Sequence, residues 1–214
     1  MAVTGDAGHW SSSFPAHLVP QIVELVVDSW TTFPKPGVSD GEVPITTRFR
    51  AHLVTRKNAL RALPVRIDRE SVEDDFNSGT ERGRIDIRFT HASSCREDVY
   101  FALECKRLNV RTKTMRCRAL AKEYVSQGVA RFASSQYAQG HRHAGMIGYV
   151  LDGRVHVAER AINRALVRVV QPLHLQVPHQ LSASSISQRP NIRETRHRID
   201  RRILVLQHLF LPSR

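Results

Sequence analysis

The sequence predicts an α/β protein made of a single domain, residues 1–214. Segments with apolar residues at helical spacing alternate along the chain with short apolar segments of strand length. A chain of 214 residues with 41% hydrophobic content suits one ordinary domain with its own core. The fold should therefore need no disulfide or other staple.

The first third of the chain is predicted to be mainly helical. Residues 1–14 are expected to form a loose lead-in, and 15–30 an amphipathic helix. After a loop rich in proline and glycine, a second helix is predicted from about Pro44 to Leu63, since proline is well suited to a first helical turn.

A first strand is predicted at residues 64–70, where apolar and polar residues alternate. The acidic stretch 71–82 that follows is predicted to be a loop. Its carboxylates Glu73, Asp74 and Asp75 would either lie in a solvated turn or assist a second metal.

Residues 83–109 contain two short apolar strands joined by a polar turn at 91–98. Because side chains alternate along a strand, Glu104 and Lys106 share one face of the second strand. If the two strands pair as a hairpin, Asp86 of the first strand lies beside Glu104. Three charged groups then converge on one point.

This convergence predicts a divalent-metal site. Two carboxylates close together on an apolar sheet favour a cation between them, and oxygen ligands suit Mg²⁺ or Mn²⁺. Asp86 and Glu104 would bind the ion, with the backbone carbonyl of Cys105 as a further ligand. Lys106 would orient or help to deprotonate an attacking water, or offset charge on a pentacovalent phosphate.

Asp86, followed after 17 residues by Glu104-Cys105-Lys106, resembles the signature of the PD-(D/E)XK, or restriction-endonuclease-like, nuclease superfamily. Ile85 stands where that signature often has proline. The resemblance implies a restriction-endonuclease-like core, in which a central mixed β-sheet is flanked by helices, and Mg²⁺-dependent cleavage of phosphodiester bonds. The predicted order of helix, strand, hairpin, helix and strand matches that core.

Two further site residues follow from the resemblance. Glu42 matches a glutamate that reaches the metal from the first core helix, although it would also stabilise a helix N-terminus through the helix dipole. A helix predicted at 116–138 would deliver a polar side chain to the site. Gln127 is the candidate, with Glu123 and Tyr124 as alternatives, and Gln127 would otherwise be merely exposed.

The remainder of the chain is predicted to add two strands and one helix. Residues 145–151 are predicted to form a continuous apolar strand, 154–170 a helix, 182–190 a mobile loop, and 203–211 a final strand, although Ile199, Ile203, Leu206 and Phe210 would also fit a helix face. On the helix, Arg160, Arg164 and Arg168 recur every four residues, which indicates either a phosphate-binding ridge or a solvated face.

A net charge of +12 favours an anionic partner, for which nucleic acid is the leading candidate. The resemblance to the endonuclease superfamily suggests DNA. A basic run leaves directly from the proposed metal site. We expect it to contact the phosphate backbone, the alternative being a solvated basic loop. Its residues are Arg107, Arg111, Lys113 and Arg116.

The three cysteines cannot all pair and have no metal-ligand spacing, so we expect reduced thiols and a cytoplasmic protein. Neither a signal peptide nor a membrane-spanning run is apparent, which predicts no membrane partner. His141 and His143 would suit zinc only if cysteine or carboxylate ligands joined them. His197 and His208 are expected to be structural or to contact phosphate.

The sequence thus predicts a Mg²⁺-dependent endonuclease, for which the resemblance suggests a role in restriction or phage defence. A chain this short lacks an obvious target-recognition domain, so targeting would come from a homodimer or a partner subunit. Two alternatives stay open. One is a non-catalytic nucleic-acid- or protein-binding module on the same fold, and the other is an unrelated basic α/β protein.

Overall fold

The computed structural model describes residues 13–60, 63–75, 78–111 and 117–213, with the backbone alone for Asp75 and Arg111. Its helices are α1 (Leu18–Thr32), α2 (Glu42–Leu60), α3 (Ala121–Tyr124), the π-helix η2 (Val125–Val129), α4 (Ala130–Ala133) and α5 (Val155–Val167). Its strands are β1 (Val65–Asp75), β2 (Thr80–His91), β3 (Phe101–Leu108), β4 (Val110–Arg111), β5 (Cys117–Arg118), β6 (His143–Val150), β7 (Ser182–Ala183), β8 (Ile192–Ile199) and β9 (Arg202–Pro212).

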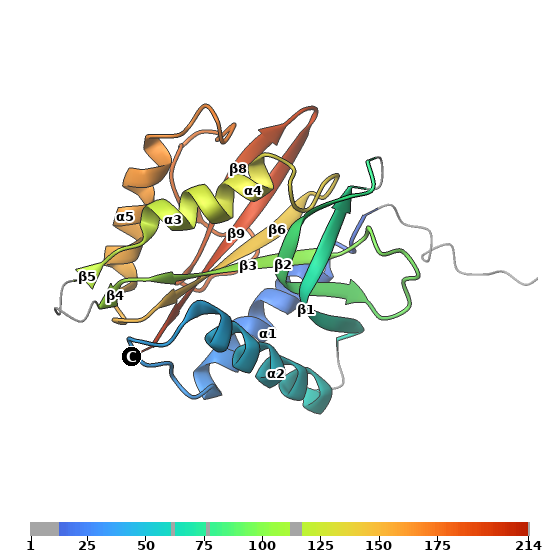
Figure 1. Cartoon of the computed structure of the whole chain (residues 1–214), viewed down its shortest axis with the longest axis horizontal. Helices are drawn as coiled ribbons and strands as arrows, with labels where there is room; N and C mark the ends of the chain where they lie inside the picture. Colours follow the sequence, from blue (N-terminus) through green and yellow to red (C-terminus); the bar gives the residue numbers. More distant parts are fainter. Residues whose placement is uncertain (1–12, 61–62, 76–77, 112–116, 214) are drawn as a thin grey trace, which may run out of the picture.

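Seven of these strands form one mixed sheet in the order β1-β2-β3-β6-β9-β8-β7 (Figure 1). The central strands β3, β6 and β9 are parallel, and the hairpins at both edges are antiparallel. Strands β4 and β5 pair separately as a small hairpin. The prediction of an α/β fold with a central mixed sheet flanked by helices is therefore confirmed.

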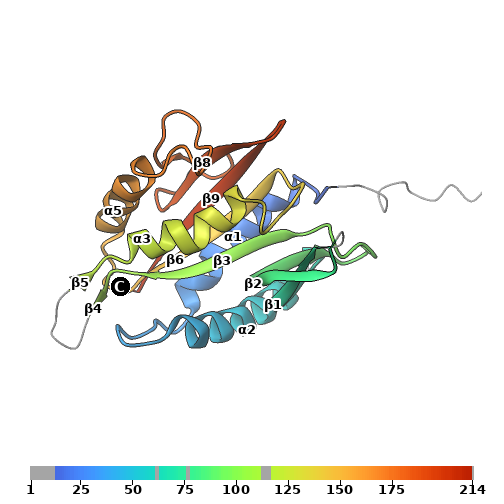
Figure 2. The same ribbon diagram turned by 45° about the horizontal axis from the view of Figure 1, so that its top comes forward.

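Helices cover both faces of the sheet (Figures 1 and 2). Helices α1 and α2 pack on one face, where Trp30, Phe49 and Tyr149 form an aromatic cluster. The run α3-η2-α4 and helix α5 pack on the other face, around residues such as Tyr124 and Ile162. Burial on both faces explains why β6 has a continuous apolar sequence.

Strand β3 alternates between these two cores as its sequence predicts. Phe101, Leu103 and Cys105 belong to the core under α1 and α2, whereas Tyr100 and Ala102 belong to the opposite one. Glu104 and Lys106 must therefore lie on the side of α3, η2 and α4. The hairpin of β2 and β3 is also as predicted, with Ile87 paired to Leu103.

The prediction of a loop at 71–82 is wrong, because β1 continues to Asp75 and pairs with β2 from Thr80 onwards. A buried polar contact explains the longer strand. The carboxylate of Glu73 is buried and accepts a hydrogen bond from the hydroxyl of Tyr100. Burial raises the pKa of Glu73, although Tyr100 and nearby arginines oppose the shift. Glu73 is thus a structural residue, not a solvated one.

The helix predicted at 116–138 is shorter and interrupted. It spans Ala121 to Ala133, with the π-helix η2 in the middle, and residues 117–118 belong to strand β5. The sequence does not predict strand β8, because several of its buried positions are polar (Glu194, Thr195 and His197) and it has no apolar alternation.

The segment 182–190, predicted as a mobile loop, is tied to its neighbours. It contains strand β7, and Ser185 donates to the buried carboxylate of Glu194. Arg189 forms ion pairs with Glu24 and Asp28 of α1. The prediction of a mobile loop rests on the small polar residues of this segment, which do not reveal these long-range contacts.

The predicted lead-in, residues 1–14, lies almost wholly outside the described residues. Phe14, however, is buried and contacts Phe101, so the ordered fold begins before α1. None of the helices in the described part of the chain is both long and apolar enough to cross a membrane. All three cysteines are free.

Candidate active site

The site forms where β2 and β3 stop pairing. The pairing ends at Ile87 and Leu103. The backbone N–H of Cys105, the next one on β3 that faces β2, therefore has no backbone acceptor on β2. The carboxylate of Asp86 takes that place, with its Oδ2 atom 2.7 Å from the Cys105 nitrogen. The carboxylate of Asp86 on β2 therefore faces the backbone of β3 where the pairing of the two strands ends.

Glu42 occupies the next position along the same edge. As the first residue of α2, it accepts a hydrogen bond from the backbone N–H of Arg107 at 3.1 Å. Its other oxygen lies 3.1 Å from the Lys106 ammonium. The glutamate therefore lies both in the first turn of a helix and at the cluster that the sequence predicts.

Glu104 is the most buried member of the cluster, with 1% of its surface exposed. Its Oε1 atom accepts hydrogen bonds from Lys106 and Arg131, each at 2.8 Å. Its Oε2 atom is buried and has no partner among the described residues. Burial, reinforced by the charge of Asp86, raises the pKa of Glu104 to about 7.

Lys106 is held as a cation at the centre of the site. Its ammonium lies within hydrogen-bond distance of Glu104, Glu42 and the carbonyl of Cys105, the last at 3.0 Å. Burial would lower its pKa, but the carboxylates of Glu104 and Glu42 outweigh burial and raise it. This electrostatic arrangement favours charge stabilisation by Lys106 over proton abstraction.

Asp86 has a raised pKa as well. Burial is the main cause, and the hydrogen bond from the Cys105 N–H and the charge of Lys106 oppose it. Both carboxylates that the sequence assigned to a metal therefore resist ionisation in the absence of a further positive charge.

The π-helix brings the opposite face of the site close to Lys106. A Cβ on Gly128 would lie 2.4 Å from the Met146 methyl group and 3.7 Å from the Lys106 side chain, so a larger residue would require the Met146 side chain to move. Single π-turns are frequent at functional sites. Here the π-turn lies directly beside Lys106, the proposed catalytic lysine.

Arg131, which sequence reasoning missed, is the side chain that this helix delivers. Gln127 is exposed and makes no contact with the cluster, Glu123 pairs with Arg118, and Tyr124 is buried against His208. The extra residue of the π-turn changes which positions face the sheet. Arg131 belongs to the predicted helix and lies four residues after Gln127, on the same face of a regular helix, but the sequence alone does not single it out as the site residue.

The donor set fits a hard divalent cation in its chemistry. Asp86, Glu104 and the Cys105 carbonyl supply oxygen atoms only, as Mg²⁺ prefers, and the unpartnered Oε2 of Glu104 is an acceptor that lacks a positive partner. Within the described residues, however, no three His, Cys, Asp or Glu side chains are grouped as a preformed metal site.

The predicted phosphate contacts are only partly described. Arg107 donates to the backbone carbonyl of Asp40 at 3.1 Å, and so secures the loop before α2. The side chain of Arg111, together with Lys113 and Arg116, lies outside the described residues. The basic run therefore supplies one residue with a structural contact and three whose side chains the structure does not describe.

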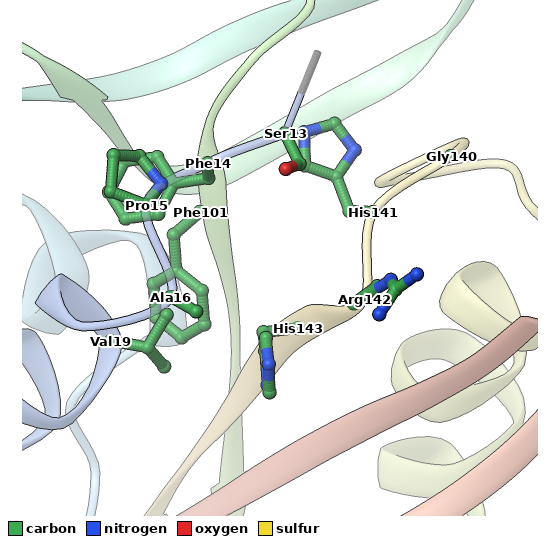
Figure 3. A pocket seen from close by; sticks show the side chains of 10 residues that line it. All are labelled: Ser13, Phe14, Pro15, Ala16, Val19, Phe101, Gly140, His141, Arg142 and His143. Atoms are coloured by element: carbon green, nitrogen blue, oxygen red, sulfur yellow. The ribbon is translucent and has the colours of Figure 1, made fainter. Parts of the chain in front are cut away.

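His141 and His143 line a separate pocket of about 600 Å³ together with Phe14 and Phe101 (Figure 3). Both ring nitrogens of His141 are engaged, one with the Tyr100 N–H and the other with the Gln139 carbonyl. This bonding leaves His141 no lone pair for zinc, so the zinc alternative loses one of its two ligands.

His197 and His208 are structural, because both are buried and linked through Thr195. His197 faces the Leu173 carbonyl and Thr195, and His208 faces Thr195 and the Tyr124 hydroxyl. Burial lowers the pKa of both, that of His208 to about 3, so both rings are neutral.

The fold and the site define an α/β protein in which three carboxylates and two cations meet at the edge of a central strand. No known protein family, curated protein or solved structure matches this chain. The resemblance to the PD-(D/E)XK superfamily therefore depends on Asp86, Glu104 and Lys106 and on the order of the surrounding elements.

Proposed function

We propose that this protein is a Mg²⁺-dependent nuclease that hydrolyses phosphodiester bonds, with DNA as the preferred substrate. The observation that carries the proposal is the meeting of Asp86 and Glu104 beside the Cys105 carbonyl, with one oxygen of Glu104 buried and unpartnered. Such a buried, electron-rich cluster is unfavourable without an added cation. A divalent ion would relieve the cost.

Asp86, Glu104 and the Cys105 carbonyl would hold the ion, which supplies Lewis-acid activation of a phosphoryl oxygen and a more acidic water. Glu42 would join them only if it gave up its contact with Lys106 or with the Arg107 N–H, since these engage both of its oxygens. Mn²⁺ would replace Mg²⁺, because both cations accept oxygen ligands.

Hydrolysis needs no other reactant than water. The water oxygen forms a new bond to phosphorus, the bond from phosphorus to the leaving sugar oxygen breaks, and that oxygen keeps the electron pair and gains a proton. Lys106 would stabilise the negative charge on the phosphoryl oxygens through its electrostatic field, because its ammonium is fixed at the site by Glu42 and Glu104.

Charge balance supports a phosphodiester substrate. Glu42, Asp86 and Glu104 carry three negative charges when ionised, and Lys106 and Arg131 carry two positive ones. A divalent ion changes the net charge of the cluster from minus one to plus one. One phosphodiester group then makes it neutral.

The distribution of positive charge supports nucleic acid as the partner. The exposed face of α5 carries Arg160 and Arg164, Arg168 follows at its C-cap, and none of the three has an ion pair within the described residues. Together with a net charge of +12, this surface favours a polyanion. A place in restriction or phage defence follows from the resemblance alone.

The test is cleavage of supercoiled plasmid and of single-stranded DNA and RNA with Mg²⁺, Mn²⁺ or EDTA. We expect metal-dependent cleavage by the wild type and a loss of about 10³-fold or more in Asp86→Asn and Lys106→Ala. Asp98→Asn, which removes an exposed carboxylate outside the cluster, is the matched control. Cleavage that survives both site substitutions would refute the assignment.

The rival is a non-catalytic nucleic-acid- or protein-binding module on the same fold. Two observations favour it: the described residues contain no preformed group of three metal-ligand side chains, and Lys106 already pairs with Glu42 and Glu104. The rival predicts DNA binding that weakens steeply with salt but no cleavage under any metal condition.

A further inference from the structure

Arg131 differs from Lys106 in how many of its hydrogen-bond donors are used. The Lys106 ammonium has three protons and three acceptors around it, on Glu104, Glu42 and the Cys105 carbonyl. It has no proton left for a substrate unless one of these contacts breaks.

The guanidinium of Arg131 has five N–H donors, and only its Nη1 group is engaged. Nη1 donates to Glu104 Oε1 at 2.8 Å and to the Tyr137 hydroxyl at 3.0 Å. Among the described residues, Nε and Nη2 have no hydrogen-bond partner. The side chain keeps 34% of its surface exposed, so this second edge is accessible.

Arg131 is also fixed in place by its neighbours. Its guanidinium lies over the Tyr137 ring, 5.4 Å from the centroid, and the Tyr137 hydroxyl donates to the Arg84 carbonyl at 2.8 Å. Gly83 makes room for this tyrosine, because a Cβ there would lie 2.9 Å from its hydroxyl oxygen. A rigid arginine with a free edge is suited to binding an anion.

We propose that Arg131 is a catalytic residue that binds the scissile phosphate through its free Nε and Nη2 edge. This edge presents the two parallel N–H groups that match two phosphate oxygens. Because the other edge shares Glu104 with the proposed metal site, a phosphate bound to the ion lies within reach. The inference rests on the proposed nuclease function and adds to it the group that recognises the phosphate.

The alternative is a positioning role, in which Arg131 only holds Glu104 for the metal. The two roles predict opposite effects on metal affinity. If Arg131 serves the phosphate, its removal takes a competing cation away from Glu104, so the affinity for Mn²⁺ stays equal or rises. If Arg131 only positions Glu104, its removal weakens Mn²⁺ binding.

The experiment compares Arg131→Gln and Arg131→Lys with the wild type, by cleavage kinetics on an oligonucleotide and by calorimetric titration with Mn²⁺. We expect Arg131→Gln to lower kcat about 10²–10³-fold, a typical effect of losing one transition-state donor. Arg131→Lys should restore little, because lysine keeps the charge but not the paired donors. Mn²⁺ affinity should not fall in either variant.

Lys122→Gln is the matched control, because it removes one positive charge from the same helical run at an exposed position away from the cluster. It should leave kcat unchanged. Folding of each variant is checked by its thermal midpoint.

The outcomes separate this inference from the proposed function. A wild type that cleaves while Arg131→Gln cleaves equally fast would overturn the inference and leave the nuclease function intact. Weaker Mn²⁺ binding by Arg131→Gln would also overturn it, in favour of a positioning role. A wild type that neither binds Mn²⁺ nor cleaves would end both.

Discussion

Glu42 and Lys106 lie 64 residues apart in the sequence, and their side chains meet at 3.1 Å. The contact joins the first residue of α2 to the strand that carries the proposed catalytic residues. Glu42 also accepts the Arg107 N–H, so the start of the helix is fixed against the edge of β3. Both sequence-based interpretations of Glu42, as a helix-end residue and as a site residue, are compatible with this position.

Glu42→Gln distinguishes these two interpretations. Glutamine still accepts the Arg107 N–H but removes a charge from Lys106, so we expect cleavage to fall about tenfold or more. If Glu42 only favours the helix N-terminus, the change costs about 0.3–1 kcal/mol of stability and leaves the rate alone. Asp40→Asn is the control, because Asp40 pairs with Arg48 and not with Lys106.

The raised pKa of Glu104 makes stability depend on pH in a defined direction. Its carboxyl group ionises at about 4.5 in the unfolded chain and at about 7 in the folded protein. Between these pH values the folded protein therefore binds more protons than the unfolded chain. The contribution of Glu104 to stability is fully present below pH 4.5 and is lost as the pH rises through 7. The full loss corresponds to about 3 kcal/mol.

Glu104→Gln should remove this pH dependence. The free energy of unfolding is measured by urea denaturation in EDTA at pH 5 and at pH 8. From the lower to the higher pH, we expect that of the variant to rise by about 2 kcal/mol relative to that of the wild type. Glu97→Gln, at an exposed carboxylate, should run parallel to the wild type at both pH values. A Glu104→Gln curve that also runs parallel to the wild type would refute the electrostatic account of this site.

The arginines of α5 should contribute to nucleic-acid binding as phosphate contacts. We expect Arg160→Gln with Arg164→Gln to flatten the slope of log K against log salt by about 1.8, since each phosphate contact contributes about 0.9. The control, Arg66→Gln with Arg96→Gln, removes the same charge from another surface. Fluorescence anisotropy with a short duplex measures both, and equal slopes for the two pairs would show that only net charge matters.

The geometry of the central hairpin could be predicted because it follows from local rules. Alternation along a strand places Glu104 and Lys106 on one face, and hairpin pairing brings Asp86 beside them. The order of helices and strands follows from periodicity in the same way. Such inferences need no knowledge of distant contacts.

The features that sequence reasoning missed depend on distant contacts or on irregular backbone. Strand β1 extends through an acidic stretch because Glu73 is buried against Tyr100, 27 residues away. Arg131, which follows the π-turn, reaches Glu104 across 27 residues of sequence. Neither a buried hydrogen bond nor a π-turn leaves a periodic pattern in the sequence.

The central claim is that Asp86 and Glu104 share one divalent cation, and calorimetric titration with Mn²⁺ tests it most directly. We expect the wild type to bind Mn²⁺ at this site, and Asp86→Asn and Glu104→Gln each to weaken that binding at least a hundredfold. A wild type that binds no Mn²⁺, or variants that bind it as tightly as the wild type, would contradict the claim.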